Sequence, residues 1–163
     1  MEPVLHLTVR PHWDELEVAR AEAVSFLRGH AFGEATINAT EMVVAELTEN
    51  AAKYGAFEEP PAPLAIAITV QGATVTVEVR SPVRSADDEH VRKLDRAVQW
   101  IRGFQNPFEA YIERLKEVSA QSLETSESGL GLVRIAYEGQ SILDFFLNDR
   151  NVLAVSAVHR SQA

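Results

Sequence analysis

The sequence contains no cysteine, which excludes disulfide bonds, thiolate zinc sites and catalysis by a cysteine nucleophile. It has no apolar run of membrane-spanning length, and its first residues lack the basic start and apolar core of a signal peptide. Positive charge is also scarce: 15 lysines and arginines stand against 24 aspartates and glutamates, a formal net charge of −9. Such a chain is not expected to bind nucleic acid through a broad basic surface. We therefore expect a cytoplasmic protein that binds neither nucleic acid nor membranes.

The hydrophobic content of 46% is that of an ordinary soluble domain. A chain of 163 residues can form one domain with a sizeable core and is short for two. We therefore expect residues 1–163 to form a single domain.

Hydrophobic periodicity divides the chain into pairs of strands and groups of helices. The predicted strands are residues 4–10, 64–71, 73–81, 141–149 and 151–160, and the predicted helices are residues 13–29, 34–54, 87–104, 107–121 and 130–139. This order predicts an α+β two-layer sandwich, in which a mixed or antiparallel sheet carries helices on one face. The other face of the sheet would be free for a partner or a second copy. Residues 81–128 form a variable helical insert between the two hairpins.

Helix 34–54 has a predicted buried stripe of Ile37, Val44, Leu47, Ala51 and Tyr54. Polar residues stand at the border of this stripe. Glu46 and Asn50 are four positions apart, so they lie one above the other on one helical face. A carboxamide oxygen is a ligand that magnesium accepts, and a carboxylate can order or deprotonate an attacking hydroxyl. The pair suits a nucleotide site, but the polar flank of an ordinary amphipathic helix has the same pattern.

The stretch ESGLGLVRIAYEG places Gly129 and Gly131 at the start of a predicted helix. Glycines there let the backbone approach a ligand closely, and the helix N-terminus offers N–H groups and a positive dipole end to a phosphate. The alternative is a tight loop-to-helix turn in which glycine avoids a clash.

Together, ELTENAAKYG on a helix and SGLGLVRIAYEG after a helical excursion resemble the GHKL ATPase superfamily. That superfamily includes histidine-kinase catalytic domains, gyrase-type ATPases and anti-sigma-factor serine kinases. In its small size this chain is most similar to the anti-sigma or switch-protein kinases. The resemblance covers nearly the whole chain apart from residues 81–128. It implies a sandwich that holds ATP and Mg²⁺ between the helices and a lid, and a small regulatory protein as partner.

The resemblance also implies a role for individual residues. Glu46 falls at the place of the general base, and Asn50 at that of the magnesium-binding asparagine. Five further residues fall where the family borders the phosphates and the sugar: Lys53, Tyr54, Gly129, Leu130 and Gly131.

The sequence departs from the family after the strand at 73–81, where it reads SPVRSADDEH instead of D-x-G-x-G. The family aspartate receives the adenine amino group, and a buried hydrogen bond left unmade costs about 1–3 kcal/mol. Glu127 stands at the place of the first glycine of the second box, while Asp87 and Asp88 are predicted to cap the next helix. Two functions remain open: an ATP-dependent serine/threonine kinase of the anti-sigma type, and an inactive interaction module that has lost ATP binding.

Five apolar residues recur in the insert at spacings of three and four: Trp100, Phe104, Phe108, Tyr111 and Leu115. Such a stripe most simply packs the insert onto its own domain. The alternative is an interface that covers the pocket, docks a partner or pairs two subunits in a homodimer. The mixed charges of DDEHVRKLDR are assigned to a solvated helix face.

Overall fold

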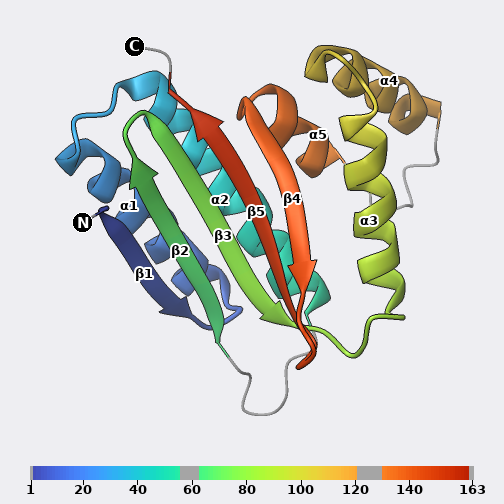
Figure 1. Cartoon of the computed structure of the whole chain (residues 1–163), viewed down its shortest axis with the longest axis horizontal. Coiled ribbons are helices and arrows are strands. Elements are labelled where there is room, and N and C mark those ends of the chain that lie inside the picture. The colour runs from blue at the N-terminus through green and yellow to red at the C-terminus, as the bar shows by residue number, and fades with distance from the viewer. Residues whose placement is uncertain (1, 56–62, 121–129, 162–163) are drawn as a thin grey trace.

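The computed structural model describes residues 2–55, 63–120 and 130–161. Within these ranges the chain forms five strands and five helices (Figure 1). The strands are β1 (Val4–Val9), β2 (Leu64–Gln71), β3 (Thr74–Pro82), β4 (Ser141–Leu147) and β5 (Val152–Arg160). The helices are α1 (Trp13–Gly29), α2 (Glu34–Tyr54), α3 (Glu89–Arg102), α4 (Pro107–Ala120) and α5 (Leu130–Tyr137).

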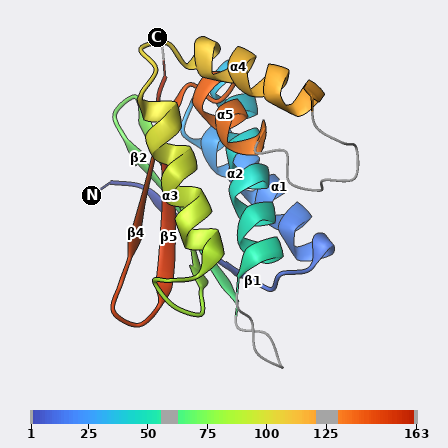
Figure 2. The same ribbon diagram turned by 90° about the vertical axis from the view of Figure 1, so that its right-hand side faces the viewer.

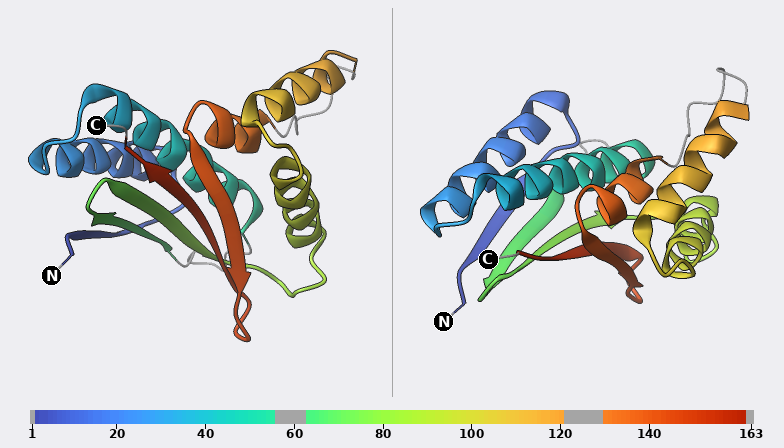
Figure 3. Two further views of the ribbon diagram at one scale, coloured as in Figure 1. Left: turned by 45° about the horizontal axis from the view of Figure 1, so that its top comes forward. Right: turned by 90° about the horizontal axis from the view of Figure 1, so that it is seen from above.

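The strands form one sheet in the order β1-β2-β3-β5-β4, and all four neighbouring pairs are antiparallel. Helices α1, α2 and α5 cover one face of this sheet (Figure 2). Helix α3 stands beside the edge strand β4, and α4 packs against α5 (Figure 3). The predicted α+β sandwich with helices on one face is therefore confirmed, with an antiparallel sheet.

The core lies between this helical layer and the inward side of the sheet. Alternate residues of the central strands point into it, because successive side chains of a strand face opposite sides. These buried residues include Leu64, Ile66 and Ile68 of β2 and Val75, Val77 and Val79 of β3. They meet Ile37, Val44 and Leu47, the stripe predicted for α2. Full burial of each such side chain contributes about 1.5–3 kcal/mol to the stability of the fold.

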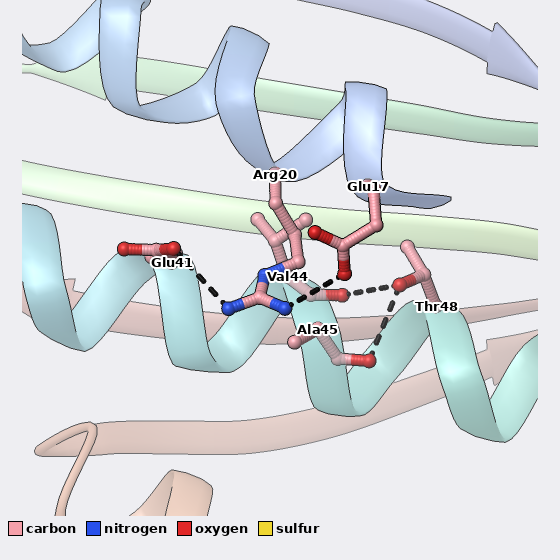
Figure 4. Close-up of polar contacts among 6 residues, drawn as sticks. All are labelled: Glu17, Arg20, Glu41, Val44, Ala45 and Thr48. Atoms are coloured by element: carbon pink, nitrogen blue, oxygen red, sulfur yellow. Dashed lines mark hydrogen bonds and ion pairs between the residues drawn. The ribbon is translucent and has the colours of Figure 1, made fainter. Parts of the chain in front are cut away.

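Polar contacts fix the position of α2 against its neighbours (Figure 4). Arg20 of α1 donates hydrogen bonds to Glu17 at 2.9 Å and to Glu41 of α2 at 3.2 Å. The Thr48 hydroxyl donates to the Val44 carbonyl at 2.6 Å, so this fully buried residue keeps a hydrogen-bond partner inside its own helix.

The C-terminal end of the described chain is also held against α2. The hydroxyls of Thr36, in the first turn of α2, and Ser161, just after β5, lie 2.8 Å apart. The Ser161 N–H donates to the Ala73 carbonyl at 2.7 Å, so the last strand is closed against the β2–β3 turn as well.

Side chains cap the starts of α3 and α4, and of the two residues predicted to cap α3, Asp88 is the one that does so. Asp88 accepts a hydrogen bond from the His90 N–H at 2.9 Å, and Asn106 accepts one from the Phe108 N–H at 2.9 Å. Because Asp88 is the cap, α3 begins at Glu89 rather than at residue 87.

The aromatic stripe of the insert divides into packed and exposed members. Phe104 and Tyr111 are half-buried and pack against the core, so they attach the insert to its own domain. Phe108 is 43% exposed, and its ring lies 5.1 Å from that of Tyr137 on α5. None of the described helices has the length and apolarity needed to cross a membrane.

Candidate functional site

A cavity of about 690 Å³ lies among α2, α5, the insert helices α3 and α4, and the neighbouring ends of β3 and β5. Its volume falls in the range of about 300–1,000 Å³ that is common for small-molecule sites. Four of the predicted site residues line it: Glu46, Asn50 and Lys53 of α2, and Gly131 of α5. The two sequence motifs therefore meet in space, although more than 70 residues separate Lys53 from Gly131.

The Glu46 carboxylate is held between α2 and α5. Its side chain is 19% exposed, and Arg134 of α5 donates from Nη1 to Oε1 at 3.0 Å. The other oxygen, Oε2, lies against Gly131, where an added Cβ would collide with it and stand 3.3 Å from Cδ. The sequence left two roles open for Gly131, a close approach to a ligand or the avoidance of a clash, and in this structure the group that an added Cβ would meet is the Glu46 carboxylate.

The surroundings of Glu46 raise the pKa of its carboxyl above the ordinary value. Burial raises the pKa of the Glu46 carboxyl, the positive charge of Arg134 opposes this, and the negative charges of Glu49 and Glu138 add to it. Glu138 accepts a hydrogen bond from Arg134 Nε at 2.9 Å, and this bond is the largest cause that raises the pKa of Arg134. A carboxylate whose pKa is raised toward neutrality is a better proton acceptor.

The charges that line the cavity are mainly positive. Four cationic side chains, Lys53, Lys93, Arg96 and Arg114, stand against two carboxylates, Glu46 and Glu117, an excess of two positive charges. This local sign is opposite to that of the chain, whose formal net charge is −9. A cleft lined by one sign of charge raises the local concentration of ligands of the other sign, so the cavity suits an anion.

The cations differ in how they are held. Arg114 of α4 pairs with Glu117 at 2.6 Å, and Lys93 of α3 lies 3.6 Å from Glu89. Arg96 is exposed and has no ion-pair partner in the described part of the chain.

Four of the lining residues on α3 lie in the stretch assigned from sequence to a solvated face: His90, Lys93, Leu94 and Arg96. Lys93 and Arg96 are indeed exposed, but that assignment missed their position at the cavity. Hydrophobic periodicity shows which side of a helix is polar, not what that side faces. The sequence did contain one signal for the side of α3 that faces inward. His90, Leu94, Ala97 and Ile101 recur at spacings of four, three and four positions.

The floor of the cavity is apolar. Its sheet side consists of Val79, Ser81, Val83, Leu153 and Val155. The family aspartate is expected after β3, and at the end of this strand the cavity instead has Ser81, which is 5% exposed. A largely apolar floor suits the face of a planar base, and a serine hydroxyl can serve as hydrogen-bond donor or acceptor.

Other predicted site residues are less fully placed. Leu130 is the half-buried first residue of α5 and is not among the lining residues. Gly129 lies outside the described residues, as does the side chain of Tyr54. Asp87, which the sequence predicts with Asp88 as a cap of α3 and not as a site residue, does not cap the helix; it is exposed and pairs with Arg92 at 3.2 Å.

The donor set fits a magnesium-bound triphosphate. The described residues contain no group of three or more histidine, aspartate or glutamate side chains that could hold a metal ion by themselves. Mg²⁺ bound to nucleotides takes much of its coordination from phosphate oxygens and water, so the Asn50 carboxamide oxygen at a cavity with excess positive charge is a suitable additional ligand.

The comparison with protein families agrees with this geometry. A model of the histidine kinase-like ATPase domain matches residues 9–137, most of the chain. The protein therefore belongs to the histidine kinase-like ATPase domain family, which confirms the resemblance to the GHKL superfamily.

The fold is also found in a solved structure. A chain of the crystal structure of the SiaB–SiaC complex from Pseudomonas aeruginosa matches with a TM-score of 0.73. The match has 21% sequence identity and covers 94% of this chain and 88% of that chain, which establishes a shared fold. No curated protein sequence matches this chain.

Proposed function

We propose that this protein is a signalling regulator of the anti-sigma-kinase type, which binds ATP with Mg²⁺ and phosphorylates a serine or threonine of a small regulatory protein. The observation that carries the proposal is one cavity lined by Glu46, Asn50 and an excess of positive charge. Family membership supports it, because the matched model is that of an ATPase domain.

In this proposal each wall of the cavity has a separate task. Bound ATP would supply the phosphoryl group, and Asn50 would hold Mg²⁺ through its carboxamide oxygen. Lys53 and Arg96 would neutralise charge on the phosphates. Glu46 would accept the proton of the attacking hydroxyl, a contribution typically worth about 10²–10⁴-fold in rate.

A small regulatory protein is the proposed partner. The matching fold comes from a structure of two proteins in complex, SiaB and SiaC, which supports a protein rather than a small molecule as the acceptor. A second copy of this chain, in a homodimer, is the alternative partner. The two are distinguished by the mass of the purified protein in solution, alone and after mixing with a candidate acceptor.

One observation favours a second function, that of an inactive interaction module. The end of β3 gives the cavity Ser81 and Val83 where the family has an aspartate. Loss of the hydrogen bond from adenine to that carboxylate would weaken binding by about one to two decades, unless Ser81 or a water replaces it.

Calorimetric titration of ATP into the purified protein, with and without Mg²⁺, separates the two functions. Micromolar binding that requires Mg²⁺, disappears in Asn50→Ala and persists in Asn38→Ala would support the kinase. Asn38 is a matched control, because it is an exposed asparagine near the other end of α2. No heat at millimolar ATP would favour the interaction module.

A further inference from the structure

The contact between Glu46 and α5 involves more than one residue. Oε1 of the carboxylate accepts a hydrogen bond from Arg134 Nη1 at 3.0 Å. Oε2 lies against Gly131, at the place that a Cβ of residue 131 would occupy. Gly131 and Arg134 are three positions apart, so they lie on one face of α5. One turn of this helix thus holds both oxygens, one by a charged hydrogen bond and the other by contact.

Arg134 is itself held in place. Its Nε donates to Oε2 of Glu138 at 2.9 Å, while its Nη1 is directed at Glu46. A guanidinium can do this because its N–H donors lie in a rigid planar fork, whereas a lysine ammonium is a single point charge on a flexible stem. The side chain of Arg134 is 40% exposed, so the contact with Glu46 lies at the edge of the packed core.

We propose that Arg134 is a positioning residue for Glu46: it holds the carboxylate against Gly131, in the orientation from which Glu46 accepts a proton, and Glu138 fixes Arg134 for this task. The proposal rests on the proposed function of Glu46 as the base, but the hold itself exists without any ligand. A base displaced by about 1 Å can lose about 10²-fold in rate, so a residue that orients it matters without touching the substrate.

The first test needs neither ATP nor a partner. Gly131→Ala places a methyl group against Oε2 only as long as Arg134 keeps the carboxylate there. Chemical unfolding is therefore measured for the wild type, Gly131→Ala, Arg134→Gln and the double variant. The midpoint loss caused by Gly131→Ala should be clearly smaller in the Arg134→Gln background, because the freed carboxylate can turn away.

Arg28→Gln is the matched control. Arg28 is an exposed arginine of α1 that pairs with Glu34 at 3.4 Å, and it does not line the cavity. Gly131→Ala and Arg28→Gln should be additive. Additivity between Gly131→Ala and Arg134→Gln as well would overturn the proposal, because Arg134 would then not determine where the carboxylate lies.

The second test uses phosphoryl transfer. Arg134→Gln should lower kcat while the KM for ATP stays near the wild-type value, and Arg134→Lys should fail to restore kcat because it lacks the planar fork. Full recovery with lysine, or a change in KM alone, would contradict a positioning role. If the wild type transfers no phosphate, the proposed function fails, and the unfolding cycle still decides whether Arg134 holds Glu46.

Glu138→Gln provides an independent variant if Arg134→Gln does not fold. It removes the carboxylate that accepts from Arg134 Nε and leaves the Arg134–Glu46 contact chemically intact. It should lower kcat relative to the wild type while the KM for ATP stays near the wild-type value. An unchanged kcat, or a raised KM for ATP, would contradict a role of this contact in orienting Glu46.

Discussion

The two walls of the cavity are built differently. On the α2–α5 wall, Leu47 is 3% exposed and Glu46 is held by Arg134 and Gly131, so a charged group is fixed by packing. On the α3–α4 wall, Lys93 and Arg96 extend from exposed positions of α3. The buried wall can keep a reacting group in one orientation, whereas the exposed wall can attract an anion. Substitutions on the first wall should change rate and stability, and substitutions on the second should change affinity.

The largest expected effect is on the buried wall. Glu46→Gln removes the proton acceptor while keeping the size of the side chain, so phosphoryl transfer should fall by about 10²–10⁴-fold. ATP affinity, measured by calorimetry, should change little. Single-turnover transfer to the acceptor protein measures the rate, with Glu22→Gln as control, because Glu22 is an exposed glutamate of α1 that does not line the cavity. Transfer at the wild-type rate in Glu46→Gln would exclude this residue as the base.

A second variant tests how tightly that wall is packed. Gly131→Ala forces the new methyl group against the Glu46 carboxylate, and overpacking of this kind typically costs about 1–3 kcal/mol of unfolding free energy. The Gly131→Ala loss should disappear when the carboxylate is removed in Glu46→Ala/Gly131→Ala, because the atoms that an added Cβ at Gly131 would meet belong to Glu46. Urea unfolding measures both. An equal loss in the two backgrounds would mean that Gly131 is required for another reason.

The exposed wall should respond in affinity. A unit charge about 4 Å from another contributes about 1 kcal/mol in water, and Arg96→Glu replaces this attraction by a repulsion of the same size, so ATP binding should weaken by about 2 kcal/mol, or roughly 30-fold. The loss should shrink as salt is added, because exposed charges are screened. Arg92→Glu is the matched control, since Arg92 is an exposed arginine of the same helix that does not line the cavity. Equal losses of ATP affinity in both variants would indicate that the overall charge of α3, and not the position of Arg96 at the cavity, determines binding.

The smallest effect concerns pH. Because burial raises the pKa of Glu46 in the folded chain, the fold binds this proton more tightly than the unfolded chain does. The contribution of Glu46 to stability is therefore full below its unfolded pKa and declines as pH rises through the folded pKa. Glu46→Gln carries no such titration. The unfolding free energy of Glu46→Gln minus that of the wild type should therefore rise as pH increases from below 4.5 toward neutrality, because the wild type loses stability over this range. A difference that is constant with pH would contradict the direction of the shift.

Much of the buried wall could be predicted from the sequence, because periodicity and caps determine it locally. The bounds of α1 and α2 and the stripe of Ile37, Val44 and Leu47 are those predicted. The spacing of Glu46 and Asn50 also predicted that they share a face, and both line the cavity.

The parts that the sequence did not reveal depend on contacts between distant residues. Arg134 and Glu46 are 88 positions apart, and no local pattern links them. The cations of α3 lie on a helix whose polar side looks like any solvated face, and only the packing of the insert beside α2 and α5 turns that side toward the cavity. Sequence periodicity thus predicts elements well and predicts their neighbours poorly.

The contact between Thr36 and Ser161 has a practical consequence for measuring partner binding. It holds the C-terminal end of the described chain beside the start of α2, whereas Glu46 and Asn50 lie toward the other end of that helix. The 14 residues from Thr36 to Asn50 correspond to roughly 20 Å along a helix. Protein attached to a sensor surface through the region around Ser161 should therefore present the cavity away from that surface, open to both nucleotide and acceptor.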